Sequence, residues 1–198
     1  MRKLLCFLCL ALLLMACNKS QQPGTSEIIK NEGEAQSELL QTYNKADSLY
    51  RQNIINDELF SNFIEKAIVF SKNYPENEIA AEMLYKAGIG SMILAKKAST
   101  LEIPDDDTKE HYAQIGINIF NMIQSTYPDY EGVKYCYLNR AFIYDDILHK
   151  YLDAEYEYRD FLHKFPNDSI CENIRMYLRV LGQDDEEIYA RIEHQQEK

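Results

Sequence analysis

Apolar residues recur at intervals of three and four positions along most of the chain after residue 34. This period is typical of amphipathic helices, and no stretch shows the two-residue alternation of a half-buried strand. The pattern predicts eight helices, at residues 35–52, 57–73, 78–97, 108–126, 131–150, 152–164, 169–181 and 185–193. Because these helices follow one another closely, we expect a single all-α domain over residues 34–198.

Two of the predicted helix starts carry a capping box, in which a polar residue is followed three positions later by Glu. The first pair is Asp107 and Glu110, and the second is Ser169 and Glu172. In this motif the first side chain accepts a hydrogen bond from an unpaired backbone N–H of the first helical turn. We therefore expect Asp107 and Ser169 to be N-cap residues.

The chain begins with a short cationic stretch, Met1-Arg2-Lys3, followed by an apolar run over residues 4–16. That run has 13 residues, whereas a helix that spans a bilayer needs roughly 20. A basic start with a compact apolar stretch is typical of a secretory signal. The sequence therefore predicts a signal peptide over residues 1–16, which is removed on export.

The end of this segment, Leu14-Met15-Ala16-Cys17, resembles the lipobox of bacterial lipoproteins. The resemblance implies that the Cys17 thiol carries diacylglycerol and that its new amino group is acylated, which anchors the protein stably in a membrane. Asn18 in the next position hints at the outer membrane. The polar residues 17–33 would then be a flexible tether. An ordinary cleaved signal followed by a chance cysteine is the alternative.

The chain is acidic, with a net charge of −11. Without residues 1–16, which contain two bases and no acid, the net charge is −13. Such a protein is repelled by nucleic acid and by anionic lipid headgroups, so we expect neither as a partner. Cys136 and Cys171, the two cysteines beyond Cys17, lie in apolar helical stretches. We interpret them as small buried side chains, with a disulfide as the alternative.

Internal repetition links several of the predicted helices. The pattern of a small residue, an aromatic residue four positions later and a proline eight positions beyond occurs at Gly116-Phe120-Pro128 and at Ala154-Tyr158-Pro166. A complementary pattern occurs at Leu84-Ala87-Gly88 and at Leu138-Ala141. Together these residues resemble the tetratricopeptide repeat. The resemblance implies a right-handed stack of antiparallel helix hairpins, an α-solenoid of about eight helices.

Three features depart from the repeat. Phe142 stands where a small residue is usual, and Asp145 stands where tyrosine is usual. Gly88 and Gly116 are 28 residues apart, whereas the resemblance implies 12, which indicates an insertion of 16 residues near residues 96–111. Repeats that end in Tyr-Pro or Phe-Pro are similar to those of exported bacterial lipoproteins, including the tetratricopeptide subunit of the outer-membrane β-barrel assembly machine.

Catalytic motifs are absent from the sequence. The four histidines have no zinc-binding spacing, and there is no phosphate-binding glycine loop or nucleophile motif. Asp145, Asp146 and His149 share a helical face, which we interpret as a charged helix end. The run Asp105–Asp107 lacks the further ligands of a calcium loop and is interpreted as a helix cap. We therefore expect no enzymatic activity, no metal and no cofactor.

Tyrosine is concentrated between residues 127 and 158, which hold eight of the 15 tyrosines. Two stripes at helical spacing are predicted core: Val133, Tyr137, Ala141, Tyr144 and Leu148, and then Ala154, Tyr158, Phe161 and Phe165. Tyr130, Tyr135 and Tyr156 lie off these stripes. Since exposed tyrosine is enriched in binding surfaces, these three are the candidate partner-binding residues.

These observations lead to a principal hypothesis and two rivals. The principal hypothesis is a lipid-anchored scaffold that binds other envelope proteins at the outer membrane, and outer-membrane protein assembly is the functional analogy that the resemblance suggests. The first rival is a lipoprotein that captures a peptide or glycan for an importer. A metal-dependent hydrolase is the second rival, and the histidine spacing argues against it.

Overall fold

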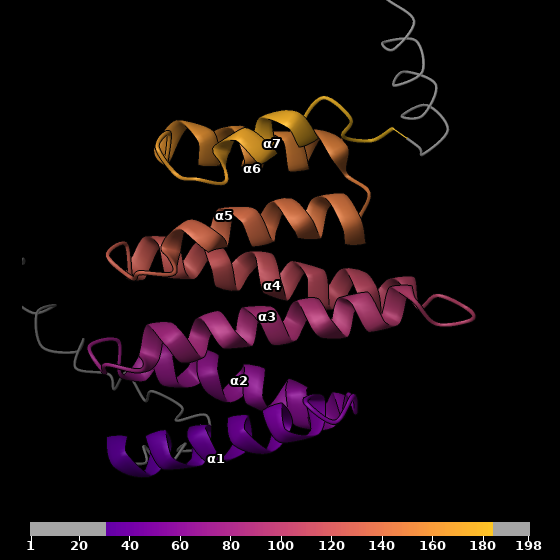
Figure 1. Ribbon diagram of the computed structural model, residues 1–198. Helices are drawn as coiled ribbons and strands as arrows, with labels where there is room; N and C mark the ends of the chain where they lie inside the picture. Colours follow the sequence, from indigo (N-terminus) through magenta and orange to yellow (C-terminus); the bar gives the residue numbers. More distant parts are fainter. Residues whose placement is uncertain (1–30, 184–198) are drawn as a thin grey trace, which may run out of the picture. The chain divides into compact units, whose positions relative to one another are not determined.

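A computed structural model describes residues 31–183 of the chain (Figure 1). This part contains seven α-helices and one π-helical segment, and no strand. The helices are α1 Glu32–Tyr50, α2 Asp57–Asn73, α3 Ala80–Ser99, α4 Asp106–Thr126, α5 Val133–Phe142, α6 Tyr151–Lys164 and α7 Cys171–Tyr177. The π-helical segment η1, Ile143–Ile147, follows α5 directly. The predicted signal peptide, Cys17 and the predicted helix 185–193 lie outside the described residues.

The all-helical prediction is confirmed, and α2 has the predicted bounds. α1 begins three residues earlier than predicted, because Asn31 is its N-cap. The Asn31 side chain accepts a hydrogen bond from the backbone N–H of Glu34 at 3.0 Å, which satisfies one of the unpaired donors of the first turn. Residues 32 and 33, which the sequence placed in the tether, are therefore helical.

Both predicted capping boxes are wrong. Asp105, rather than Asp107, is the N-cap of α4, and its carboxylate accepts a hydrogen bond from the Thr108 backbone N–H at 3.0 Å. α7 has no side-chain cap in its N-terminal turn. Instead, Asp168 in the preceding turn accepts a hydrogen bond from the backbone N–H of Ile170 at 3.1 Å. Ser169 therefore lies between Asp168, whose side chain caps the turn, and the start of α7, and it is not the N-cap.

The predicted helix 131–150 is interrupted. Its α-helical part ends at Phe142 and continues as η1, in which the helix takes up an extra residue per turn. η1 ends at Ile147, and His149, two residues later, has a positive φ of 52°. The seventh helix is also shorter than predicted, since it ends at Tyr177 instead of residue 181.

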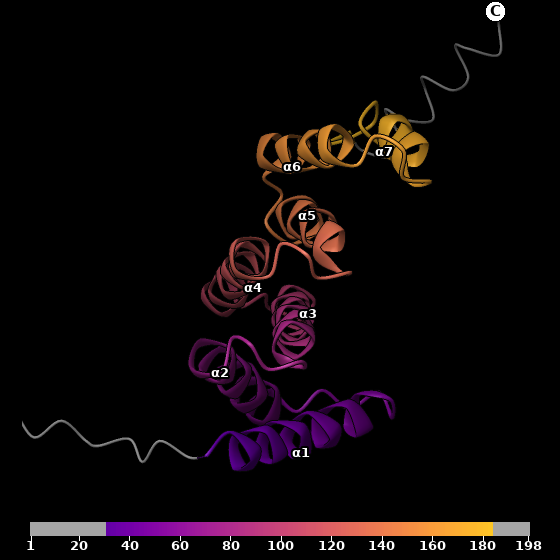
Figure 2. The ribbon, with the colours of Figure 1, turned by 90° about the vertical axis from the view of Figure 1, so that its left-hand side faces the viewer.

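Consecutive helices pack on one another along the described chain. α1 packs on α2, α2 on α3, α3 on α4, α4 on α5 and α5 on α6, and α7 contacts α6. Figures 1 and 2 show these helices one above the next, and in Figure 2 α2 and α4 lie to the left of α3 and α5. α3 and α5 are thus offset from α2 and α4 across the stack.

The packed interior contains the residues that the repeat pattern placed there. Ala141, Ala154 and Phe161 are fully buried, Tyr137 is nearly so, and the other stripe residues are partly buried. Cys136 and Cys171 are buried free thiols, so the interpretation as small core residues is confirmed. Burial raises the pKa of the Cys136 thiol to about 12, which keeps it protonated and unreactive.

One buried charge was not anticipated from the sequence. Arg140 on α5 donates to the Glu157 carboxylate on α6 at 2.6 Å and to the Asn121 side chain of α4 at 2.8 Å. Gln124 of α4 accepts a further hydrogen bond from the same guanidinium. The guanidinium therefore joins three consecutive helices.

None of the described helices is long and apolar enough to cross a membrane.

Candidate partner-binding groove

Three adjoining cavities are lined mainly by residues of the odd-numbered helices. Their volumes are about 140, 350 and 550 Å³. Tyr50, Ile89 and Ile93 line both the first and the second cavity, and Met92 and Phe142 line both the second and the third. Because neighbouring cavities share lining residues, they adjoin one another in a row from α1 across α3 and α5 to α7. We call this row of cavities the odd-helix groove.

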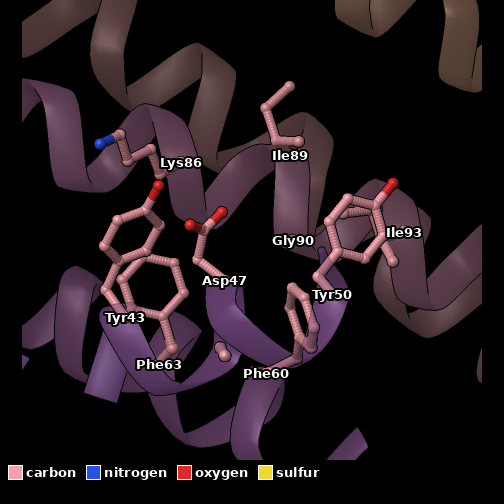
Figure 3. A pocket seen from close by; sticks show the side chains of 10 residues that line it. Tyr43, Asp47, Tyr50, Phe60, Phe63, Lys86, Ile89, Gly90 and Ile93 are labelled. Atoms are coloured by element: carbon pink, nitrogen blue, oxygen red, sulfur yellow. The ribbon is translucent and has the colours of Figure 1, made fainter. Parts of the chain in front are cut away.

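The first cavity lies where α1, α2 and α3 meet (Figure 3). Its walls are mainly aromatic and aliphatic, with the rings of Tyr43, Tyr50 and Phe60 among them. The Asp47 carboxylate stands between the tyrosines. An apolar cavity of about 150 Å³ can hold a benzene ring. The first cavity, at about 140 Å³, is therefore large enough for one aliphatic or aromatic side chain.

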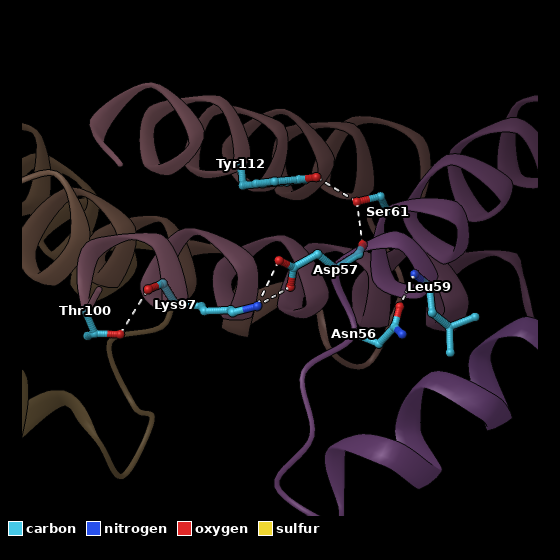
Figure 4. A network of polar contacts seen from close by, with 7 residues as sticks. All are labelled: Asn56, Asp57, Leu59, Ser61, Lys97, Thr100 and Tyr112. Carbon is cyan, nitrogen blue, oxygen red and sulfur yellow. Dashed lines mark hydrogen bonds and ion pairs between the residues drawn. The ribbon is translucent and has the colours of Figure 1, made fainter. Parts of the chain in front are cut away.

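Polar contacts fix the second cavity, which is lined by the stems of Lys96 and Lys97. The Lys97 ammonium bridges both Asp57 carboxylate oxygens at 2.7 and 2.8 Å, which ties the end of α3 to the start of α2 (Figure 4). Nearby, the hydroxyls of Ser61 and Tyr112 share a hydrogen bond of 2.6 Å between α2 and α4. These contacts hold three helices together beside the groove.

The third cavity combines apolar walls with two adjacent carboxylates. Asp145 is nearly buried and accepts a hydrogen bond from the Tyr177 hydroxyl. Asp146 pairs with Lys96 of α3 at 2.5 Å. Tyr158 lines the same cavity, and burial together with the two carboxylates raises its pKa to about 12. The described residues that line this cavity include no Lys, Arg or His.

Aromatic rings are exposed along the whole groove. Tyr50, Phe142 and Tyr177 have exposed fractions of 44%, 39% and 41%. Large apolar surfaces that remain exposed in a folded domain mark sites of association, and aromatic residues dominate the binding energy of protein interfaces. The three rings come from α1, α5 and α7. They therefore offer contacts to one ligand that lies across several helices.

The tyrosines that the sequence singled out lie elsewhere. Tyr135 and Tyr156 are exposed, at 45% and 69%, but neither lines the groove. Tyr130 is partly buried and packs on Tyr85 with 6.0 Å between ring centroids, and burial raises its pKa to about 12. No ring contact joins any two of the three candidates in the described part of the chain. The structure does not bring them into one site.

Sequence reasoning missed the groove residues, although a signal was present. Phe142 and Asp145 were recognised as departures from the repeat, and both line the third cavity. A large aromatic residue at a position that favours a small one cannot be accommodated between helices, so it projects from the surface. Departures from a packing pattern therefore marked the site more directly than the tyrosine count did.

No metal centre is evident between residues 31 and 183, where no three His, Cys, Asp or Glu side chains gather closely enough to hold an ion. The lipidation candidate Cys17 lies outside the described residues.

Comparison with known protein families, with curated protein sequences and with solved structures gave no match.

Proposed function

We propose that this protein is a lipid-anchored scaffold of the bacterial envelope, which holds a segment of a partner protein in the odd-helix groove. The observation that carries the proposal is the groove itself. It runs over α1, α3, α5 and α7, and it exposes aromatic rings from three of these helices. A protein segment is long enough to contact all three rings at once, whereas a small molecule fills one cavity.

The arrangement of the helices supports a tetratricopeptide-like, right-handed stack as part of this proposal. In Figure 2, α2 and α4 lie on one side of the stack and α3 and α5 on the other. The small residues of the repeat also lie at helix contacts: Gly88 of α3 abuts Phe120 of α4, and Gly116 of α4 abuts Ile143 of η1. In such a stack the first helices of successive pairs form the binding surface. The groove occupies that surface.

The sequence before the described domain supports membrane attachment. Residues 14–17 resemble a lipobox, and the segment that follows is polar. A lipid on Cys17 would place the helical domain near a membrane surface without inserting it. We propose the outer membrane as the site of attachment and outer-membrane protein assembly as the process, by analogy with the lipoproteins that the repeats resemble.

One observation favours a second candidate function, the capture of a peptide or glycan for an importer. The third cavity has a volume of about 550 Å³, which lies in the range of small-molecule sites, and it presents carboxylates and phenols to a ligand. In that case only the third cavity would be occupied. The first cavity and the exposed ring of Tyr50 would then have no role.

Site-specific photocrosslinking in cells tests the proposed function. A benzophenone amino acid replaces Phe142 in the groove or, as a control, Leu152, which is exposed on α6 and does not line the groove. We expect a discrete protein adduct from position 142 and none from position 152. Equal labelling at both positions, or none at position 142, would contradict the proposal. Adducts to glycan or short peptide alone would support the second candidate.

A further inference from the structure

We propose that the odd-helix groove selects a basic, apolar segment of its partner, and that an arginine of this segment enters the third cavity. This inference rests on the proposed function and adds the chemistry of the partner. It commits to one occupant, a segment in which at least one arginine is flanked by aliphatic or aromatic residues. The support comes from the charges, the contacts and the walls of that cavity.

The charge of the third cavity is not balanced from within. Asp145 and Asp146 are lining residues, and no described lining residue is basic. Asp145 makes no ion pair with any residue of the described domain, and its hydrogen bond comes from the neutral hydroxyl of Tyr177. A nearly buried carboxylate without a cation is costly. A cationic group of the partner would remove that cost.

The neighbouring carboxylate is available for exchange. Asp146 pairs with Lys96, but both side chains of this pair remain about two-fifths exposed to solvent. Exposed ion pairs contribute little free energy, so a cation that is better placed can take over the carboxylate. The existing pair also shows that a cationic group can reach this carboxylate from the groove side, because Lys96 itself lines the second cavity.

Arginine suits the cavity better than lysine does. Its planar guanidinium can donate two parallel hydrogen bonds to a carboxylate and can stack on an aromatic face. The cavity offers both features, since Tyr158, Tyr177 and the exposed ring of Phe142 line it with the two carboxylates. A lysine ammonium could pair with the carboxylates but could not stack its plane on the aromatic rings.

The remaining walls define the rest of the segment. Met92, Leu138, Ile170 and Ile174 give the third cavity an apolar floor. The first cavity, at the other end of the groove, accepts one apolar side chain. A segment with apolar residues on both sides of the arginine therefore matches the groove along its length. The net charge of −13 without residues 1–16 also attracts basic partners over a longer range.

Selection from a random-peptide phage library tests the inference. The full chain, purified in detergent, is the bait, and bound phage are counter-selected against the Phe142→Asp variant so that only groove-dependent peptides remain. We expect these peptides to be enriched in arginine with aliphatic or aromatic neighbours. Groove-dependent peptides that are neutral or acidic would overturn the inference and leave the proposed function standing. The absence of any groove-dependent peptide would overturn both.

Matched variants then locate the arginine. Asp145→Asn with Asp146→Asn should weaken the binding of a selected peptide by about tenfold or more, since two charge-assisted contacts are lost. The control, Asp107→Asn with Glu110→Gln, changes the net charge equally at exposed positions of α4 and should leave affinity within about twofold.

Replacement of the peptide arginine by its neutral isostere citrulline should match the loss seen with the double asparagine variant. If both double variants weaken binding equally, the attraction is non-specific and the third cavity is not the arginine site. Circular dichroism and thermal melting of each variant establish that it is folded. Tyr177→Phe, which keeps the ring and removes the hydroxyl, should retain binding.

Discussion

Gly88 of α3 and Phe120 of α4 lie so close that a Cβ atom at position 88 would be 2.6 Å from Cε1 of the Phe120 ring. The ring cannot move away, because it is fully buried. Ile119 is also close, with its Cγ2 atom 3.2 Å from the same position. The contact between α3 and α4 therefore requires glycine at position 88.

Gly88→Ala should lower the free energy of unfolding by about 1–3 kcal/mol, because the added methyl overpacks the contact with Phe120. Gly33→Ala is the matched control. There the new Cβ would meet Asn31 Oδ1 at 3.4 Å, an ordinary contact, and alanine favours the helix. Urea unfolding followed by circular dichroism measures both. Equal stability of the two variants would show that α3 and α4 are not packed as described.

Glu157→Ala should destabilise the domain by about 3–5 kcal/mol, because it leaves the buried Arg140 guanidinium without its ion-pair partner. Glu155→Ala, two residues earlier on α6, removes an exposed pair with Arg159 and should cost less than about 1 kcal/mol. Thermal unfolding distinguishes the two changes. A small loss for both would mean that the guanidinium is hydrated rather than buried.

Asp168 gives the domain a pH-dependent contribution to stability. The ion pair with Lys134 and the hydrogen bond from the Ile170 backbone lower the pKa of this carboxyl below its usual value. A group with a lowered folded pKa stabilises the fold above its unfolded pKa, about 3.9, and loses that contribution as the pH falls through the folded pKa.

Asp168→Asn should therefore lower the melting temperature at pH values near neutrality and have a smaller effect in strong acid, where the wild-type carboxyl is protonated as well. The measurement is the melting temperature of both proteins as a function of pH. A constant difference across the whole range would contradict the assigned ion pair.

Cys17→Ser should abolish membrane attachment without a change in the fold, because none of the described helices includes residue 17. Fractionation of cells that export the variant measures attachment, and circular dichroism of the purified protein measures helicity. The exported variant should be recovered in the soluble fraction. Its continued recovery with membranes would refute the lipoprotein proposal.

The helices were predictable because their apolar period depends only on sequence, whereas their ends depend on the path of the chain. Three consecutive aspartates, Asp105, Asp106 and Asp107, stand at the start of α4, and from the sequence any of them could cap it. Asp105 does so because its backbone N–H also bonds to the carbonyl of Ala98 at 3.2 Å, which returns the loop to the end of α3. This hydrogen bond joins the two ends of a loop, and no local sequence motif connects the residues at those ends.

The groove was less predictable than the helices. Exposure of Tyr50, Phe142 and Tyr177 depends on which helices face one another, and that is a property of the assembled stack. The π-helical segment also shifts the register after Phe142, so a simple helical count from α5 misplaces Asp145. Tyr130, Tyr135 and Tyr156 were chosen because they lie off the predicted core stripes, and that criterion does not show which exposed positions line the groove.

Hydroxyl-radical footprinting of side chains tests the central claim most directly. The oxidation rates of Tyr50, Phe142 and Tyr177 are compared between purified protein attached to lipid vesicles and protein in its native membranes, where the partner is present. We predict lower rates in native membranes for these three groove residues and unchanged rates for Tyr135 and Tyr156. Protection of Tyr135 and Tyr156 instead, or no protection at the groove, would contradict the account.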